Sequence, residues 1–482
     1  MTEADDGPGA DDPPSLPAPV RGSFRDPCSR VYDDGSRILR GLNRRASADF
    51  EAVAQTGFFH VATGAGLLVA TSRDPHHALA PHGWTATLEH ERLPIVTYPY
   101  EWTFSMLRDA ALVHLDLVRR GLALGVGCKD GTSYNVQFAG SAPVFIDLGS
   151  FEPVGADPWP GYRQFCQQLL YPLLIEAYLD VPFNPWLRGS LEGITPQQAD
   201  RLLRGRRRLR RGVLAHVTAQ AFAARRYTDR DDPAASTTAG DRKRIVSALV
   251  ARLHTLIAGL PTPAAESTWS SYPDRSHYAA EALAAKDAFV GAAIGAVQPA
   301  TVVDLGCNDG RYARLAAERG AAVVALDADR QVVDRLYRDL RRTGGDLSRS
   351  IVPLVSDLAD PSPRLGWGLE ERAALEDRVR PDLVLSLALI HHLVIGRNIP
   401  IASYLDALAA MAPEVVLEIP HRDDPMVQRL LSAKPDDTHT DYDATHIAEL
   451  VRARFDVVAE EVLPGGTRTL QHLRARRPTT SS

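Results

Sequence analysis

The stretch that decides the fold of the second half of the chain is Val302–Tyr312, VVDLGCNDGRY. An apolar run typical of a buried strand ends at Leu305, a loop with two glycines follows, and a helical pattern begins at Arg311. Gly306 and Gly310 allow a tight turn and let the backbone approach a ligand closely. Because open α/β sheets bind ligands at the carboxyl ends of their strands, the sequence predicts a binding loop here.

Acidic residues follow the next two predicted strands. Asp327 ends the second strand, 21 positions after Gly306, a spacing that suits an acid binding ribose hydroxyls. Asp357 follows the third strand in the same way. Helical patterns separate most of the strands, so the sequence predicts an α/β domain with a parallel sheet covered on both faces. The predicted strands begin at Thr301, Ala322, Ile351, Pro381 and Glu414.

Two kinds of nucleoside cofactor are candidate ligands for this loop. A dinucleotide site needs GxGxxG, whereas this chain has GxxxG, and Asp309 would repel a pyrophosphate. The loop therefore favours a cationic nucleoside without phosphate, and S-adenosylmethionine (SAM) is such a ligand. Residues 267–477 resemble the class I SAM-dependent methyltransferases, which share DxGxxxG followed by the two acids. The resemblance implies a Rossmann-like, seven-stranded methyltransferase sheet.

The resemblance also assigns roles to individual residues. Asp327 would hold the ribose, and Asp357 with Leu358 would contact the adenine. Four loop residues would surround the methionine portion of SAM: Asp304, Gly306, Asn308 and Gly310. The family often adds an aromatic or basic residue upstream, for which this chain offers Trp269, Tyr272, Tyr278 and Lys286.

Two adjacent histidines follow the fourth predicted strand, Leu383–Leu387. His391 and His392 stand where the methyltransferases usually place substrate-facing residues. One of them is a candidate general base for an alcohol acceptor, and packed or capping histidines are the alternative interpretation. A second polar cluster follows the fifth strand: Glu418, His421, Asp423 and Asp424.

The N-terminal half contains another set of spaced polar residues. Asp130 and Asn135 are five positions apart, and Asp147 follows Asn135 by 12 at the end of an apolar run. Kinases space a catalytic Asp, a metal-binding Asn and a metal-binding Asp in this way. Residues 98–184 therefore resemble the C-lobe of protein kinases and aminoglycoside phosphotransferases. The resemblance implies that Asp130 faces an acceptor hydroxyl and that Asn135 and Asp147 bind Mg²⁺ with ATP.

This second resemblance has departures. Cys128 and Lys129 replace the usual residues before the catalytic Asp, and the best glycine-rich candidate, Thr63–Gly66, is poor. No lysine precedes Lys129, so Arg37 or Arg40 would have to replace the lysine that grips the phosphates. An active phosphotransferase, a kinase-like binding module and chance spacing all stay open.

Composition limits the broad class of protein. The 482 residues carry a net charge of −6, with 45% hydrophobic and 24% charged residues, which is ordinary for a soluble globular chain. The weak basic footprint argues against a nucleic-acid partner. No apolar run reaches the ~20 residues of a membrane span, and the acidic start lacks the features of a secretory signal. With four widely spaced cysteines, the expected location is the cytoplasm. The strong preference for Arg over Lys indicates a bacterial coding bias.

The whole chain divides into five expected segments: a disordered tail (1–22), an α+β kinase-like domain (23–226), a linker and helix (227–266), the methyltransferase domain (267–477) and a tail (478–482). It resembles a bacterial group of two-part methyltransferases that includes host-specific nodulation proteins. Segments such as YPYEWTFSMLRDAAL and PVFIDLGSFE carry that resemblance.

The function implied is SAM-dependent O-methylation of a hydroxyl on a glycan, glycolipid or natural product. In this interpretation the N-terminal domain recognises the small-molecule or glycan acceptor. The alternatives are a bifunctional kinase–methyltransferase that also uses Mg-ATP on a glycan, and a non-catalytic SAM-binding scaffold.

Overall fold

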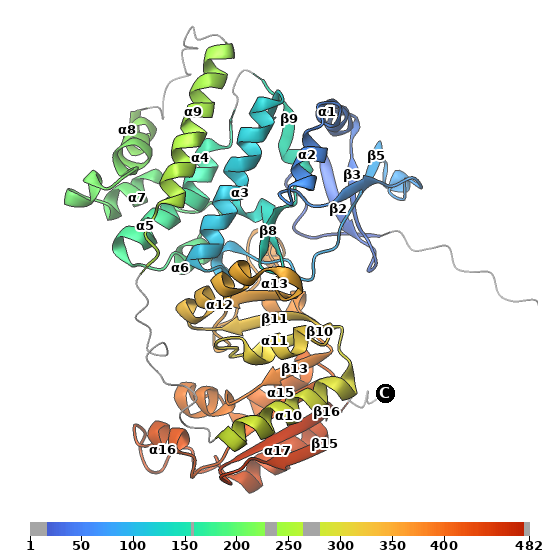
Figure 1. Cartoon of the computed structure of the whole chain (residues 1–482), viewed down its shortest axis with the longest axis vertical. Helices are drawn as coiled ribbons and strands as arrows, with labels where there is room; N and C mark the ends of the chain where they lie inside the picture. The colour runs from blue at the N-terminus through green and yellow to red at the C-terminus, as the bar shows by residue number, and fades with distance from the viewer. Residues whose placement is uncertain (1–16, 156–158, 227–238, 264–279, 477–482) are drawn as a thin grey trace, which may run out of the picture.

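The computed structural model describes residues 17–155, 159–226, 239–263 and 280–476 (Figure 1). They form an N-terminal domain up to residue 263 and a C-terminal domain from residue 280, packed against each other. Within the described ranges, no helix has the length and apolar character needed to cross a bilayer. The upstream candidates Trp269, Tyr272 and Tyr278 lie outside the described residues.

The N-terminal domain begins with an antiparallel sheet in the order β1-β2-β3-β5-β4. Its strands are β1 (Ala18–Pro19), β2 (Ser29–Asp33), β3 (Ile38–Leu42), β4 (Thr71–Arg73) and β5 (Ala86–His90). Helices α1 (Arg44–Gln55) and α2 (Phe58–Gly64) connect β3 to β4. Ala18 of β1 pairs with Asp33 of β2. Residues 18–20, which the sequence analysis placed in a disordered tail, instead form backbone hydrogen bonds with β2.

A mostly helical part follows, built around α3 (Phe104–Ala123). Thr103 caps this helix by accepting a hydrogen bond from Met106 N, and most of its apolar side chains are buried. Two short antiparallel pairs accompany it: β6 (Val126–Cys128) with β9 (Phe151–Pro153), and β7 (Val136–Ala139) with β8 (Ala142–Phe145). The remaining helices are α4 (Tyr162–Phe165), α5 (Tyr171–Leu179), α6 (Asn184–Gly189), α7 (Pro196–Leu202), α8 (Ala219–Arg226) and α9 (Ala239–Ala258).

Helix α9 confirms the helix predicted after the linker. Leu253 and Ile257 are fully buried, whereas Ile245 near its start is exposed. The helix lies alongside α3 (Figure 1), so it belongs to the N-terminal domain.

The C-terminal domain contains the predicted seven-stranded sheet, in the order β12-β11-β10-β13-β14-β16-β15. The first five strands of that order are parallel, and β16 runs antiparallel to both of its neighbours. The strands are β10 (Thr301–Leu305), β11 (Ala322–Asp327), β12 (Ile351–Val355), β13 (Leu383–Ser386), β14 (Glu414–Pro420), β15 (Phe455–Val462) and β16 (Arg468–Ala475). All five strands predicted from the sequence are present.

Helices cover both faces of this sheet. They are α10 (Ala280–Val297), α11 (Arg311–Ala317), α12 (Arg330–Thr343), α13 (Gly345–Ser350), α14 (Leu375–Arg378), α15 (Ile401–Met411), α16 (Pro425–Leu431) and α17 (Ala444–Arg454). Val302 and Val303, adjacent on β10, belong to two different apolar clusters, as expected for a strand buried on both faces. The Val303 cluster continues into the N-terminal domain, where Phe138 meets Tyr337 of α12 edge to face at 6.0 Å.

Candidate functional site

The loop after β10 is held against the end of β11. Gly306 N and Cys307 N both donate to Leu326 O, at 2.8 and 2.9 Å, and Asn308 N donates to Asp327 Oδ2 at 3.0 Å. Gly306 has φ +71°, a left-handed conformation that only glycine adopts at little cost. These bonds fix the predicted binding loop beside the acid that was expected to hold a ribose.

A cavity of about 490 Å³ opens at this carboxyl edge of the sheet. That volume lies within the range of small-molecule and cofactor sites. Eight of the predicted site residues line it: Asp304, Gly306, Asn308, Asp327, Asp357, Leu358, His391 and His392. Gly310 does not line the cavity. It starts α11 with φ +77°, and a Cβ there would lie 2.6 Å from Leu336.

Asp304 carries a buried carboxylate that faces the cavity. The residue is 2% exposed, and its Oδ2 atom has no hydrogen-bond partner among the described residues. Burial raises the pKa of Asp304 to about 7. A cationic ligand group at this oxygen would compensate the lost hydration, because an opposite charge favours the ionised carboxylate. The site therefore suits an ammonium group of a bound ligand.

Asp327 and Asp357 differ from Asp304 in their partners. Asp327 accepts backbone hydrogen bonds from Asn308 and Asp329 and still reaches the cavity. Asp357 forms an ion pair with Arg397, which also lines the cavity and which the sequence motifs did not single out. A ligand that binds Asp357 through an amine would share this carboxylate with Arg397.

The two predicted histidines lie side by side on the cavity wall, with ring centres 4.1 Å apart. His391 is 1% exposed, and its Nδ1 atom has no partner within the described part of the chain. Burial, with Arg468 nearby, lowers the pKa of His392 to about 4. Burial, with the charges of His392 and Arg468, lowers the pKa of His391 well below its ordinary value. Both imidazoles are therefore neutral near pH 7. Ala388, just before them, has φ +54°, the kind of backbone strain that clusters at functional sites.

A buried ionic network crosses the side of the cavity formed by α10, β14 and β16. Lys286 Nζ lies 2.6 Å from Glu418 Oε2, and Arg468 Nη1 lies 3.1 Å from Glu418 Oε1. Arg468 also pairs with Asp424 at 2.7 Å. Sequence spacing singled out Lys286, Glu418 and Asp424 separately. It missed Arg468, which lies on the antiparallel strand outside every motif.

The spaced polar residues of the N-terminal domain also come together. Ser150 Oγ lies 2.6 Å from Asp147 Oδ2 and 3.1 Å from Asp130 Oδ2, within hydrogen-bonding distance of both. Asn135 Nδ2 lies 2.9 Å from Ser150 Oγ and 3.4 Å from Asp147 Oδ2. Arg40, on β3, pairs with Asp147 Oδ1 at 2.8 Å. Of the two arginines that the sequence offered in place of a lysine, Arg40 is the one that reaches this cluster.

This cluster does not fit a Mg-ATP site in its present arrangement. Both oxygens of Asp147 are engaged, and the nitrogen of the Asn135 amide points at Asp147. Within the described ranges, no group of three His, Cys, Asp or Glu side chains is arranged to hold a metal ion. The glycine-rich candidate, Thr63–Gly66, lies at the end of α2 and not in a loop between two paired strands. No phosphoryl-transfer step follows from this geometry.

The strand order and the binding loop at its centre define the C-terminal half as a methyltransferase-like α/β domain with a nucleoside-sized site. Over 459 residues the chain is 33% identical to the nodulation protein NoeA of Rhizobium meliloti (strain 1021), covering 94% of this chain and 95% of NoeA. The chain belongs to the family of NoeA. No protein-family model matches it.

Two solved structures are similar to less than half of this chain. Magnesium protoporphyrin IX methyltransferase (ChlM) from Synechocystis PCC 6803, with bound SAH, is 16% identical with a TM-score of 0.30, covering 40% of this chain and 84% of its own. The N-methyltransferase NodS from Bradyrhizobium japonicum WM9 is 11% identical with a TM-score of 0.30, covering 41% of this chain and 97% of its own. The fold assignment rests on the strand order of the sheet.

Proposed function

We propose that the chain is a class I SAM-dependent methyltransferase that methylates a hydroxyl of a glycan, a glycolipid or a natural product. The observation that carries the proposal is the convergence of Asp304, Asp327 and Asp357, from three neighbouring strand ends, on one cavity of about 490 Å³. Kinship with a nodulation protein favours a glycan or a secondary metabolite as the acceptor.

The cavity residues would divide the cofactor among them. The unpartnered oxygen of Asp304 would accept the ammonium of the methionine portion, and Asp327 would accept the ribose hydroxyls. Asp357 and Leu358 would hold the adenine. When bound, SAM supplies an electrophilic methyl group on a sulfonium. The walls of the site would then orient the acceptor for in-line attack, and such positioning contributes much of the rate.

The histidine pair supplies the proposed base. A neutral imidazole can accept a proton from an acceptor hydroxyl as that oxygen attacks. Burial keeps both rings neutral near pH 7 and keeps bulk water from the unpartnered Nδ1 atom of His391. We propose that His391 or His392 takes the proton of the acceptor.

For the N-terminal domain we propose a kinase-like recognition module. Support comes from its five-stranded sheet followed by a helical part, and from the assembly of Asp130, Asn135 and Asp147 in one cluster. The bifunctional alternative needs Mg-ATP, and the ion pair between Arg40 and Asp147 disfavours it. The scaffold alternative predicts cofactor binding without methyl transfer.

Isothermal titration of the full chain, first with SAM and then with Mg-ATP, tests the proposal. We expect SAM to bind and the Asp327→Ala variant to lose at least tenfold in affinity. Unchanged affinity in that variant would remove the cofactor assignment. Transfer of labelled methyl to a glycan or natural-product panel then separates the enzyme from the scaffold. Binding of Mg-ATP at an independent site would instead establish the bifunctional alternative.

A further inference from the structure

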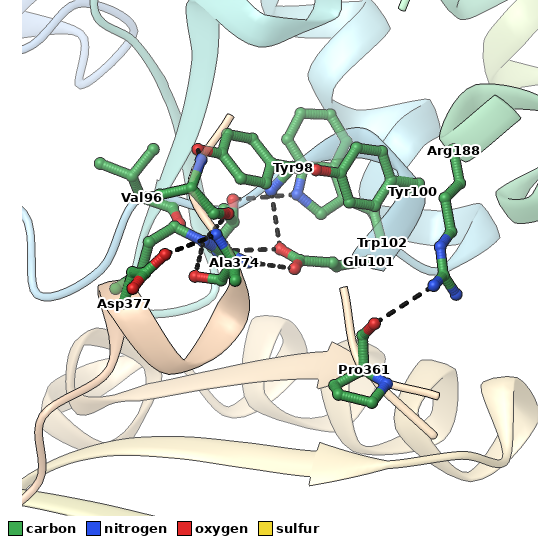
Figure 2. Close-up of polar contacts among 12 residues, drawn as sticks. Val96, Tyr98, Tyr100, Glu101, Trp102, Arg188, Pro361, Ala374 and Asp377 are labelled. Atoms are coloured by element: carbon green, nitrogen blue, oxygen red, sulfur yellow. Dashed lines mark hydrogen bonds and ion pairs between the residues drawn. The ribbon is translucent and has the colours of Figure 1, made fainter. Parts of the chain in front are cut away.

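The chain between β12 and β13 joins the cavity to the N-terminal domain. It begins with Asp357 and Leu358, which line the cavity. Asp360, two residues further on, is held by Arg188 of α6 through contacts of 2.8 and 3.0 Å. Arg188 Nη2 also donates to Pro361 O at 3.2 Å (Figure 2). Arg188 of the N-terminal domain therefore binds both the Asp360 carboxylate and the Pro361 carbonyl, directly after the residues that line the cavity.

The far end of the same connection is fixed by a buried ion pair. Arg378 of α14 pairs with Glu101, whose side chain is 1% exposed, and Arg378 Nη1 also donates to Val96 O at 2.5 Å. The guanidinium lies 4.3 Å from the ring centre of Tyr98, and Tyr98 Oη accepts a hydrogen bond from Ala373 N at 2.9 Å. Figure 2 shows Glu101 and Tyr98 beside the turn at Ala374. Such a fork-to-carboxylate pair fixes geometry as well as charge.

The middle of the connection contacts both parts of the N-terminal domain, the five-stranded sheet and the mostly helical part. Arg25, in the β1–β2 loop, makes two contacts with Glu371, at 2.5 and 2.8 Å. A Cβ on Gly22, in the same loop, would lie 2.4 Å from Glu371 O, so the two backbones are in close contact. Arg372 lies 4.3 Å from the ring centre of Tyr134, one residue before Asn135.

We propose that the N-terminal domain positions residues 357–378 and thereby sets the affinity of the cofactor site, with Arg188 and Glu101 as its positioning residues. The proposal rests on the proposed function in one respect, namely that Asp357 and Leu358 bind the adenine end of SAM. Its physical basis is preorganisation, because a loop already held in its binding conformation loses less entropy when the ligand arrives. The N-terminal domain would thus act on the cofactor site without touching the cofactor.

The test compares Arg188→Ala with Arg454→Ala in the full chain. Arg454 also forms a two-contact ion pair, with Asp406, but it lies in α17 away from the connection. We expect Arg188→Ala to weaken binding of SAM and of 5′-methylthioadenosine by the same factor, about two- to fivefold, a size set by the modest strength of exposed pairs. Arg454→Ala leaves both affinities unchanged. Arg188→Lys should restore only part of the lost affinity. Lysine keeps the positive charge, but it cannot bind the carboxylate through two nitrogens.

Two further measurements separate positioning from general stability. Exchange of the backbone amide hydrogens at positions 357–360 and 362 should accelerate in Arg188→Ala and not in Arg454→Ala, with both melting temperatures close to that of the parent. Glu101→Gln should weaken the binding of both ligands at least as much. Its melting temperature should fall, because Arg378 loses its counter-ion. Unchanged exchange and unchanged affinity in Arg188→Ala would overturn the proposal. If the parent protein binds no SAM, but hydrogen exchange still accelerates in Arg188→Ala, only the proposed function is contradicted.

Discussion

Arg40 and Asp147 stand 107 residues apart in the chain, and their side chains form an ion pair of 2.8 Å in the N-terminal domain. Arg40 also lies 3.2 Å from His90 Nε2, and Asp147 is tied to Ser150 at 2.6 Å. The pair therefore neutralises the carboxylate that the kinase resemblance assigns to a metal.

The first prediction concerns this pair. Asp147→Asn leaves the mostly buried guanidinium of Arg40 without its counter-ion and should cost about 1–3 kcal/mol of folding free energy. Denaturant titration measures the cost. SAM affinity should stay within twofold of the parent. A loss of SAM binding in a variant that keeps its stability would contradict a purely structural role.

Asp130→Asn is the matched control in the same cluster. Burial, together with the charge of Asp147, raises the pKa of Asp130, so its ionised form is already disfavoured. Replacing it with a neutral isostere should leave stability unchanged or slightly higher. In the same denaturant titration, therefore, only Asp147→Asn of these two variants should lower the stability.

The second prediction concerns pH at the cofactor cavity. Burial raises the pKa of Asp304 from its ordinary value of 3.8 to about 7. Between pH 4 and 7 the folded state therefore holds a proton that the unfolded state has lost. Stability contributed by this group is therefore present at low pH and falls as pH rises through that window. Asp304→Asn removes this dependence, and its melting temperature should gain on the parent as pH rises from 4 to 7.

The pH dependence of SAM binding should also reflect the ionisation of Asp304. A cationic ligand needs ionised Asp304, so the affinity of the parent for SAM should increase from pH 6 to pH 8, by up to about tenfold for each unit below the pKa. Titrations in two buffers of different ionisation enthalpy should detect proton release at pH 6.5. In Asp304→Asn both the pH dependence and the proton release should disappear. Their persistence would assign them to another group.

The third prediction concerns the proposed base. Replacing the catalytic member of the pair, by His391→Asn or His392→Asn, should lower kcat about 10²–10⁴-fold with SAM affinity unchanged. Because burial lowers the pKa of His392 to about 4, its protonation should not limit the rate between pH 6 and 8. Single-turnover assays with an acceptor from the methyl-transfer screen measure the effect. Full turnover in both variants would exclude both histidines.

The fourth prediction concerns the network beside the cavity. Glu418 faces two cations, Lys286 at 2.6 Å and Arg468 at 3.1 Å. Glu418→Gln leaves both without that carboxylate and should cost about 3–5 kcal/mol, the usual result of breaking a buried pair. Lys286→Met should cost less, because Arg468 still faces Glu418. Equal losses in the two variants would show that the contacts of Glu418 with its two partners are not independent.

Much of the C-terminal domain was predictable because its signals are local. The strand at Val302, the glycines of the loop and the acids at 327 and 357 form short patterns along the chain, and parallel strands bring their carboxyl ends to one edge. Lys286 was a candidate on position alone, and the structure places it on the cavity wall. Arg468 and Arg397 escaped prediction because no local pattern marks the partner of a distant charge.

The sequence by itself determined the positions of five strands along the chain, the chemistry of the loop after β10 and the spacing of Asp130, Asn135 and Asp147. These features depend on backbone periodicity and on residue types a few positions apart. Only the tertiary structure decided that Arg40 neutralises Asp147, and that Arg188 and Glu101 hold the connection between β12 and β13. Glu101 and Arg378 are 277 residues apart, and such contacts form only when both domains have folded and packed together.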